Sequence, residues 1–279
     1  MWNGKRVCVV LMTYAERDSI RGVIEGFLAT GVVDEVLVVD NNAEAGTEEE
    51  VRTTPARLVR EPRQGYGHAT RRGLLEADGD LIVLAEPDGT FLPQDIMKLL
   101  VYSDECEVVL GTRTTRELIW SGANMAWFLK WGNWGVAKVI ELLFNTSHLS
   151  DVGCTYRLLH RHIAHDVARD MTVGGNHAGP EIMLLTIASG ARFVEVPVNY
   201  LPRVGESSVT GRPLVAVEVA LRMIVLVVRT RLRTRRRVPR APALVVTNPP
   251  VLDEGEDRLP LDASGPHNVI LAAKRDRRT

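Results

Sequence analysis

The sequence predicts an α/β fold built on a mainly parallel β-sheet flanked by helices. Its first half alternates short apolar runs with segments whose apolar residues recur at helical spacing, such as Ile20, Ile24 and Phe27. Strands that are apolar on both faces are typical of parallel sheets, because the crossover helices bury both sides. Polar residues follow directly after several of these strands, which predicts a ligand site at one edge of the sheet.

The expected elements follow one another in a regular order. Strands are expected at 6–14, 34–40, 56–61, 80–86 and 106–113, and helices at 16–30, 67–77 and 92–103, with a short one starting at Thr47. The second half gives a Trp-rich segment at 117–144, a turn and strand at 151–161, a helix at 179–190, a strand at 192–200 and a loop at 201–211. We therefore expect an α/β domain over 1–212, an apolar-then-basic helix over 213–238 and a disordered tail over 239–279.

Composition and charge pattern exclude several classes of protein function. The chain has 279 residues, a net charge of -1 and no apolar run long enough to cross a bilayer, so we expect a cytoplasmic protein. Its three cysteines are widely spaced and form neither a metal pattern nor a disulfide framework. Arginines are concentrated in RTRLRTRRRVPR, 229–240, but no aromatic stacking platform accompanies them, so a nucleic-acid partner is not expected.

Four polar clusters are predicted to share one edge of the sheet, because ligands bind beyond the carboxyl ends of parallel strands. They are Thr13 and Tyr14, Asp40 to Asn42, Glu86 and Asp88, and Thr112 and Arg113. Glu86 and Asp88 lie two residues apart and offer the oxygen ligands that a hard divalent cation prefers; such a cation bridges nucleotide phosphates. The alternative is an acidic turn, since Asp-Gly is also common in turns.

Two further motifs have both a ligand-binding and a structural interpretation. Asp40 and Asn42 end a strand at a place where a carboxylate accepts hydrogen bonds from a ribose or a base, or they form an Asx-turn or a helix cap. Gly65 precedes a helix and follows a cationic segment, and backbone donors at a helix N-terminus favour an anion such as pyrophosphate. A flexible loop with solvated arginines is the alternative for Gly65.

The order of the motifs resembles that of inverting family 2 glycosyltransferases with a GT-A fold, near the dolichol-phosphate mannosyltransferase-like branch. The matching segments are VVLMTYAERDSI, VLVVDNN, REPRQGYGHATRRG, AEPDGTF, VLGTR, DVGCTYRLLHR and EVPVNYLPRVGESSVTG. They cover roughly residues 5–215. The resemblance implies a Rossmann-like nucleotide-diphospho-sugar transferase fold, a nucleoside-diphosphate sugar as donor, and Mg²⁺ or Mn²⁺ as cofactor.

The resemblance also implies roles for single residues. The family's nucleotide-binding motifs match Thr13, Tyr14, Glu16 and Asp40. Asp88 matches the second acid of the metal motif, whereas the first acid is Glu86, one methylene longer than the usual aspartate. Arg203 and Ser207 match the late R-x-G-x-S loop, which in relatives lies over the donor phosphates or the acceptor. The lysine that usually follows this serine is replaced by Ser208.

The acceptor decides which catalytic groups the reaction needs. A lipid phosphate is already an anion and needs no strong base, and Arg113, Arg157 and Arg203 are the candidates to hold it. A hydroxyl acceptor needs a general base. Glu181 is one candidate, because family members often carry a catalytic acid at this point, and Asp151 is the other. Glu181 has the alternative role of stabilising the N-terminus of its helix.

The helix at 213–237 combines an apolar run with the arginine cluster, which is typical of a segment lying on an anionic membrane surface. A packed helix with a solvated basic end is the alternative. We expect a metal-dependent glycosyltransferase at the inner membrane face that transfers to a polyprenyl-phosphate-type acceptor. Its catalytic candidates are Asp88, Arg113, Asp151 and Glu181. The alternatives are transfer to a soluble hydroxyl acceptor, and a non-catalytic nucleotide-sugar-binding or membrane-recruiting subunit.

Overall fold

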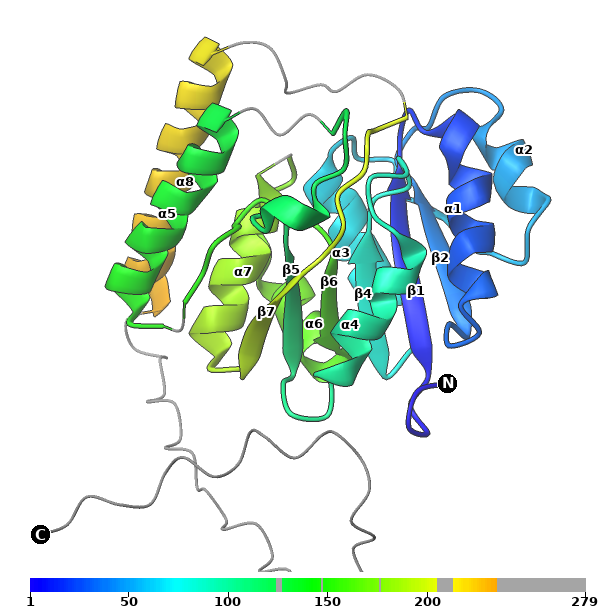
Figure 1. Cartoon of the computed structure of the whole chain (residues 1–279), viewed down its shortest axis with the longest axis horizontal. Helices are drawn as coiled ribbons and strands as arrows, with labels where there is room; N and C mark the ends of the chain where they lie inside the picture. Colours follow the sequence, from blue (N-terminus) through cyan, green and yellow to red (C-terminus); the bar gives the residue numbers. More distant parts are fainter. Residues whose placement is uncertain (124–126, 147, 176, 205–212, 235–279) are drawn as a thin grey trace, which may run out of the picture. The chain divides into compact units, whose positions relative to one another are not determined.

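The computed structural model describes residues 1–123, 127–146, 148–175, 177–204 and 213–234 (Figure 1). Within these residues one seven-stranded sheet has the strand order β3-β2-β1-β4-β6-β5-β7. Its strands are β1 (Val7–Thr13), β2 (Glu35–Asp40), β3 (Arg57–Arg60), β4 (Leu81–Ala85), β5 (Val108–Thr112), β6 (Arg157–His160) and β7 (Phe193–Pro197). β6 pairs antiparallel with β4 and β5, and the other described pairs are parallel. The predicted mainly parallel α/β sheet is thus confirmed.

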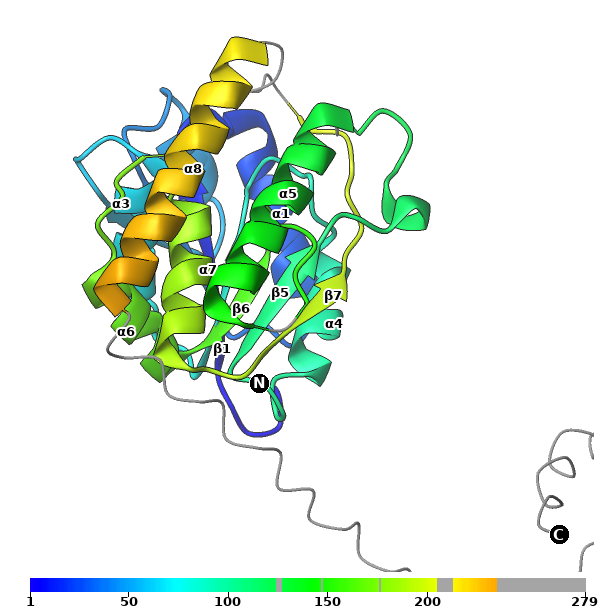
Figure 2. The same cartoon turned by 90° about the vertical axis from the view of Figure 1, so that its left-hand side faces the viewer.

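Helices cover both faces of this sheet. They are α1 (Arg17–Ala29), α2 (Thr47–Arg52), α3 (Tyr66–Glu76), α4 (Ile96–Val101), α5 (Trp127–Phe144), α6 (Arg161–Asp170), α7 (Ala178–Ser189) and α8 (Pro213–Thr234). Short 3₁₀ turns lie at η1 (Pro93–Asp95) and η2 (Arg116–Leu118). The core on one face contains residues of α1 and α4, whereas the core on the other contains residues of α3, α5, α6, α7 and α8 (Figures 1 and 2).

The side chains of β1 show why the strands are apolar throughout. Val9 and Leu11 enter the core beneath α1 and α4, and Val10 and Met12 enter the core beneath α3 and α7. Both faces of the strand are therefore buried, and the alternation that would mark a half-exposed strand is absent from its sequence.

Two features of the second half differ from the expected pattern. The strand expected within 151–161 is the short β6, and it is inserted antiparallel between β4 and β5. Its direction places its first residue at the edge where β4 and β5 end. Helix α6 was not predicted, although Ile163, Ala164 and Val167 form a buried helical stripe in it. Its interspersed histidines, arginines and aspartates obscure that stripe in the sequence.

The C-terminal helix α8 packs beside α5 and α7 (Figure 2). Met223 and Val227 of α8 are buried in the core of that face. Within the described ranges, no helix has the length and apolar character needed to cross a membrane. Ser207, Ser208, the arginines that follow Thr234 and the tail expected at 239–279 lie outside the described residues.

Candidate active site

The end of β1 is organised by the Glu16 carboxylate, which lies just before α1. Its Oε2 accepts hydrogen bonds from the backbone N–H groups of Tyr14 and Ala15, at 2.7 and 2.9 Å, and from the Thr13 hydroxyl at 3.2 Å. Thr13 is buried, whereas the ring of Tyr14 is exposed. Glu16 thus fixes the loop that presents Tyr14 at the edge of the sheet.

The end of β2 is held by a local hydrogen bond of Asp40 with the backbone, in line with its structural interpretation. Asp40 Oδ1 accepts a hydrogen bond from the N–H of Ala43 at 2.8 Å, and its other oxygen lies 3.3 Å from Arg60. The next residue, Asn41, is buried; it donates to the carbonyls of Glu61 and Arg63 and accepts from the N–H of Gly65. Asn42 has a φ of 57° and donates to the carbonyl of Pro62 and the side chain of Gln64. This strand end and the segment before α3 are therefore held as one unit.

Beyond β4, Glu86 and Asp88 converge on the guanidinium group of Arg203. Arg203 Nε donates to Asp88 Oδ2 at 2.6 Å, and its Nη2 donates to Glu86 Oε2 at 3.3 Å. Asp88 Oδ1 accepts from the N–H and the hydroxyl of Thr90. Backbone bonds from Leu201 to Thr90 and from Val204 to Asp88 keep the Arg203 segment against the acids. The two predicted metal ligands thus both contact the positively charged guanidinium group of Arg203.

Burial and the neighbouring Asp88 carboxylate raise the pKa of Glu86 to about 7, although Arg203 acts in the opposite direction. Burial disfavours the charged form of Glu86 most strongly, and repulsion by the Asp88 carboxylate two residues away adds to it, so that the single arginine does not offset the two together. The site is therefore short of positive charge. Cation binding at this point would favour the ionised form of Glu86.

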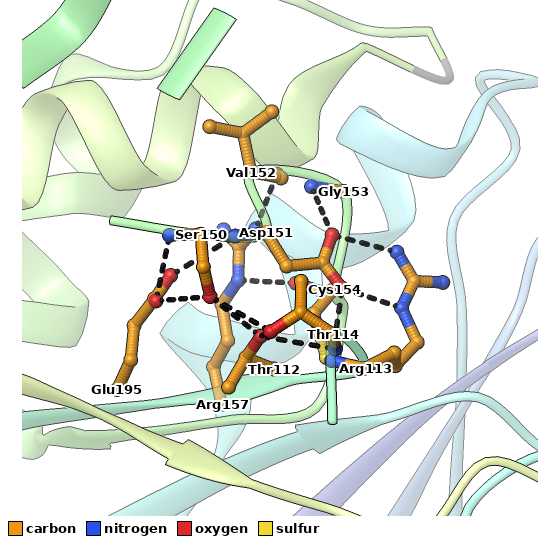
Figure 3. A network of polar contacts seen from close by, with 10 residues as sticks. All are labelled: Thr112, Arg113, Thr114, Ser150, Asp151, Val152, Gly153, Cys154, Arg157 and Glu195. Atoms are coloured by element: carbon orange, nitrogen blue, oxygen red, sulfur yellow. Dashed lines mark hydrogen bonds and ion pairs between the residues drawn. The ribbon is translucent and has the colours of Figure 1, made fainter. Parts of the chain in front are cut away.

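Beyond β5, Arg113 is clamped by Asp151 (Figure 3). Nε and Nη2 of Arg113 donate to the two oxygens of Asp151 at 2.8 and 2.9 Å, and the backbone N–H of Arg113 adds a third bond at 3.1 Å. The guanidinium group also lies 5.2 Å from the ring centroid of Tyr200. Burial opposes ionisation of Asp151, but the charge and hydrogen bonds of Arg113 outweigh it and lower the pKa of Asp151. Asp151 is therefore an ionised partner of Arg113.

Glu181, in the first turn of α7, is buried and binds the preceding loop. Its Oε1 accepts from the N–H and hydroxyl of Thr172, and its Oε2 accepts from the N–H of Val173. The carbonyl of Gly174 in the same loop accepts from the N–H groups of Gly67 and His68 at the start of α3. The donors that the sequence analysis assigned to a pyrophosphate are thus engaged within the protein.

The same contact explains the glycines before α3. Gly65 has a φ of 138°, and a Cβ there would lie 2.2 Å from the carbonyl oxygen of Gly174. A Cβ on Gly67 would lie 2.0 Å from the carbonyl oxygen of Val173. Only glycine lets the two backbones approach this closely.

Arg157, predicted as one of three anion-binding arginines, is 1% exposed and lies inside the domain. Its three hydrogen bonds go to the backbone carbonyls of Cys154, Gly179 and Val152, at 2.7, 2.5 and 3.1 Å. Arg157 therefore joins the segment before β6 to the start of α7. Of the three arginines, Arg113 and Arg203 are the two whose guanidinium groups pair with acids rather than with buried backbone carbonyls.

Three contributors to this edge are not evident from the sequence. Asn41 was quoted only as part of its motif, although it makes more contacts than Asn42. Tyr200 and Glu195 were assigned only to a strand, and both contact residues of the Arg113 network. An acid within an otherwise apolar run, as in FVEVP, is the one signal that points to Glu195.

A family comparison assigns the chain to a known class of enzyme. The model of glycosyl transferase family 2 matches residues 8–167, more than half of the chain. The chain belongs to glycosyl transferase family 2. The matched range contains Asp40, Glu86, Asp88, Arg113 and Asp151, so the resemblance seen in the sequence motifs is confirmed.

This glycosyltransferase has relatives with varied names. An uncharacterized glycosyltransferase of Mycobacterium tuberculosis is 29% identical over 222 residues, which cover 75% of this chain and 91% of the relative. A dolichyl-phosphate hexose transferase of Haloferax volcanii is 27% identical over 203 residues, which cover 72% of this chain and 85% of the relative.

Solved structures confirm the GT-A fold expected for this glycosyltransferase. Glucosyl-3-phosphoglycerate synthase of Mycobacterium tuberculosis, in complex with Mn²⁺, UDP and glucosyl-3-phosphoglycerate, has a TM-score of 0.59 and 17% identity, covering 81% of this chain and 80% of its own. The same synthase with Mn²⁺, UDP-glucose and phosphoglyceric acid has a TM-score of 0.60 and 17% identity, covering 85% and 82%.

Proposed function

We propose that this glycosyltransferase moves a sugar, with inversion, from a nucleoside-diphosphate sugar to a polyprenyl-phosphate-type acceptor, using Mg²⁺ or Mn²⁺ held at Glu86 and Asp88. The observation that carries the acceptor class is the engagement of both candidate bases. Both carboxylate oxygens of Glu181 accept hydrogen bonds from the loop at Thr172 and Val173, and Asp151 forms an ion pair with Arg113. An acceptor that is already an anion needs neither of them.

Glu86 and Asp88 fit a divalent cation. Their Oε2 and Oδ2 atoms face the same guanidinium group, so a positive charge is already accommodated between them. Within the described part of the chain, no group of three or more His, Cys, Asp or Glu residues is arranged as a metal site. A two-carboxylate site suits a cation that takes its remaining ligands from substrate phosphates and water. This is the arrangement expected when metal and donor bind together.

The reaction then needs charge placement more than proton transfer. An oxygen of the acceptor phosphate attacks the anomeric carbon, the bond from that carbon to the diphosphate oxygen breaks, and the nucleoside diphosphate leaves. A bound divalent cation would stabilise the charge of the leaving diphosphate. Arg113, which is oriented by Asp151 and Tyr200, is the candidate to hold the acceptor phosphate, and Arg203, once displaced from the acids, is the second candidate.

The exposed face of α8 supports a membrane-borne acceptor. Its exposed apolar residues are Ile224, Val225, Val228 and Leu232. Arg229 and Arg233 are also exposed on this part of the helix, whereas Arg231 turns inward and donates to the carbonyl of Leu143. Apolar side chains flanked by arginines favour an anionic lipid surface.

The relatives divide between two acceptor classes. The Haloferax relative is named for a dolichyl phosphate, which supports the lipid acceptor. A second candidate function is transfer to a hydroxyl of a soluble phosphorylated acceptor, because the structural neighbours were solved with phosphoglyceric acid and glycerol 3-phosphate. Arg113 is equally placed to hold such a phosphate, but this reaction would need a base.

The first experiment identifies the donor. The melting temperature is followed with UDP-, GDP- and dTDP-sugars, each with and without Mn²⁺, since a ligand of the native state raises it by mass action. The selected donor is then supplied with a polyprenyl monophosphate in vesicles or with phosphoglyceric acid, and the sugar is traced to the lipid or the aqueous phase. Label that enters only the aqueous acceptor would contradict the lipid proposal.

Glu181→Gln separates the two chemistries. With a phosphate acceptor, kcat is expected to stay within about threefold of wild type, whereas loss of a general base lowers it by roughly 10²–10⁴-fold. Melting curves show whether the loop at Thr172 survives the change. A loss of the larger size in a folded variant would favour the hydroxyl acceptor.

Vesicle sedimentation tests the membrane surface. Val225→Asp is expected to reduce binding to vesicles containing phosphatidylglycerol, because it places a negative charge on the exposed face of α8. Val101→Asp is the matched control, since Val101 is similarly exposed but lies on α4. Equal binding of both variants and the wild type would remove the α8 surface from the proposal.

A further inference from the structure

Glu195, in the middle of β7, is a partly buried carboxylate to which the proposed reaction gives no role. Its Oε2 accepts from the backbone N–H and the hydroxyl of Ser150, both at 2.7 Å, and its Oε1 accepts from the N–H of Asp151 at 3.3 Å (Figure 3). Glu195 pairs with Leu110 across the β5–β7 ladder, two residues before the end of β5. Both of its oxygens are therefore directed at the segment that carries Asp151.

Asp151 transmits this contact to Arg113. The Asp151 carboxylate makes three hydrogen bonds with Arg113 and accepts one more from the N–H of Gly153. The direction of the guanidinium group thus depends on where the Asp151 backbone lies. That backbone is fixed on one side by Glu195 and on the other by the turn to Gly153.

The hydroxyl groups around Ser150 add a second connection (Figure 3). Ser150 Oγ lies 2.8 Å from Thr112 Oγ1 and 3.2 Å from Thr114 Oγ1, and the two threonine hydroxyls are 2.9 Å apart. A serine hydroxyl has one hydrogen, and the Glu195 carboxylate takes it. In any hydrogen bond with the threonines, Ser150 must therefore be the acceptor. The charge of Glu195 thus orders the hydroxyls on both sides of Arg113 in the chain.

We propose that Glu195 is a positioning residue that fixes Arg113 for the acceptor phosphate by holding Ser150 and Asp151. This inference rests on the proposed function, in which Arg113 binds that phosphate. Glu195 touches neither substrate. A carboxylate is required because both of its oxygens face N–H donors, and a glutamine amide would point its own N–H₂ at one of them.

Calorimetric binding of geranyl phosphate, a short prenyl monophosphate, tests the inference without a known donor. Arg113→Gln is expected to weaken binding by on the order of 30-fold, because a charged partner is lost. Glu195→Gln is expected to weaken it roughly five- to tenfold, because one hydrogen-bond acceptor becomes a donor facing an N–H group. If Glu195 acts through Arg113, the double variant binds no more weakly than Arg113→Gln alone.

Two controls separate positioning from general destabilisation. Glu107→Gln is matched, because Glu107 also accepts a backbone N–H, that of Arg192, and contacts His162 away from this network. It should bind geranyl phosphate like the wild type. The affinity of Glu195→Gln for a nucleotide with Mn²⁺ should also equal that of the wild type. Ser150→Ala, which removes only the hydroxyl link, should weaken geranyl phosphate binding about twofold.

The possible failures are distinguishable. Normal binding by Glu195→Gln beside weak binding by Arg113→Gln would overturn the positioning role and leave the proposed function standing. The positioning role would also be overturned if the losses of affinity caused by Glu195→Gln and Arg113→Gln multiplied in the double variant. If Glu195→Gln does not fold, normal binding by Ser150→Ala overturns the positioning role instead. Normal binding by Arg113→Gln, or no binding by the wild type, would overturn the proposed acceptor site and the inference with it.

Discussion

The two ends of the sheet edge are built in different ways. At the β1–β2 end, several of the fixing contacts are local: Glu16 binds the N–H of Tyr14, and Asp40 binds the N–H of Ala43, while the contact of Asn41 with the carbonyl of Glu61 spans only 20 positions. At the β5–β7 end they join distant segments, because Arg113 and Asp151 are 38 positions apart and Ser150 and Glu195 are 45 apart. The first end combines turn chemistry within a few residues with contacts between neighbouring strand ends. The second is fixed only when the domain has folded.

Glu86 and Asp88 stand between these two ends and combine both features. Asp88 is held locally by Thr90, two residues away, and also by Arg203, 115 positions away. A short motif thus provides the acids, and a distant segment sets the charge around them. Substitutions of the acids and of the distant arginines therefore test the local and the long-range contacts separately.

The largest effect is expected at Asp88. Asp88→Ala should lower the transfer rate by on the order of 10³-fold or more and abolish the Mn²⁺-dependent rise in melting temperature with the donor, because a ligand for the cation is lost. Asp104→Asn is the control, since Asp104 pairs with Lys5 at the surface. Residual activity above a tenth of wild type would show that the cation is held elsewhere.

Arg157 should matter most for stability. Arg157→Met should lower the free energy of unfolding in urea by ~2–4 kcal/mol, because three buried carbonyls lose their donor. Arg169→Met is the matched control, because Arg169 is an exposed arginine paired with Asp166. Equal stability of the two variants would mean that the segment before β6 is held without Arg157.

Cation affinity should depend on pH through Glu86. Its folded pKa of about 7 lies above its ordinary value of 4.5, so between these values the folded state holds the extra proton. Raising the pH through this window lowers the contribution of Glu86 to the free energy of unfolding. The affinity for Mn²⁺ rises over the same window, because Glu86 loses the proton that competes with the cation. Electron paramagnetic resonance should show affinity increasing about three- to tenfold between pH 6 and 8. Glu86→Gln should bind more weakly, and its curve should be flat; a slope unchanged from wild type would assign the titration to another group.

The smallest effect is expected at Arg203. Because Arg203 shares the acids with the cation, Arg203→Gln should bind Mn²⁺ alone a few-fold more tightly, by roughly two- to fivefold. The same variant should bind the donor with Mn²⁺ more weakly, since a cation near the phosphates is lost. Arg21→Gln, which changes a surface pair on α1, is the control. Weaker binding of Mn²⁺ alone would mean that Arg203 supports the cation rather than competing with it.

The contrast between the two ends also explains what could be predicted from the sequence. Apolar runs marked β1, β2, β4 and β5, and the polar residues after them lie at one edge as expected. The Glu86–Asp88 pair was recognisable for the same reason. The antiparallel insertion of β6 and the partners of Arg113 and Arg203 depend on contacts between remote segments, which a local pattern does not encode. The side chain of Arg157 shows the limit, since an arginine at the start of a short strand gives no sign in the sequence of facing inward.

The Arg113–Asp151 ion pair has a consequence for how this enzyme class diversifies. The pair joins the two ends of a chain excursion that leaves the sheet after β5, includes α5 and returns just before β6. Because the excursion is closed at its base, insertions or deletions in its loops leave both ends in place, while α5 must keep its buried face against the core. The segment between Arg113 and Asp151 can therefore vary while its two ends stay fixed. Evolution or an engineer could replace it to suit a new acceptor while the sheet and its metal-binding acids stay the same.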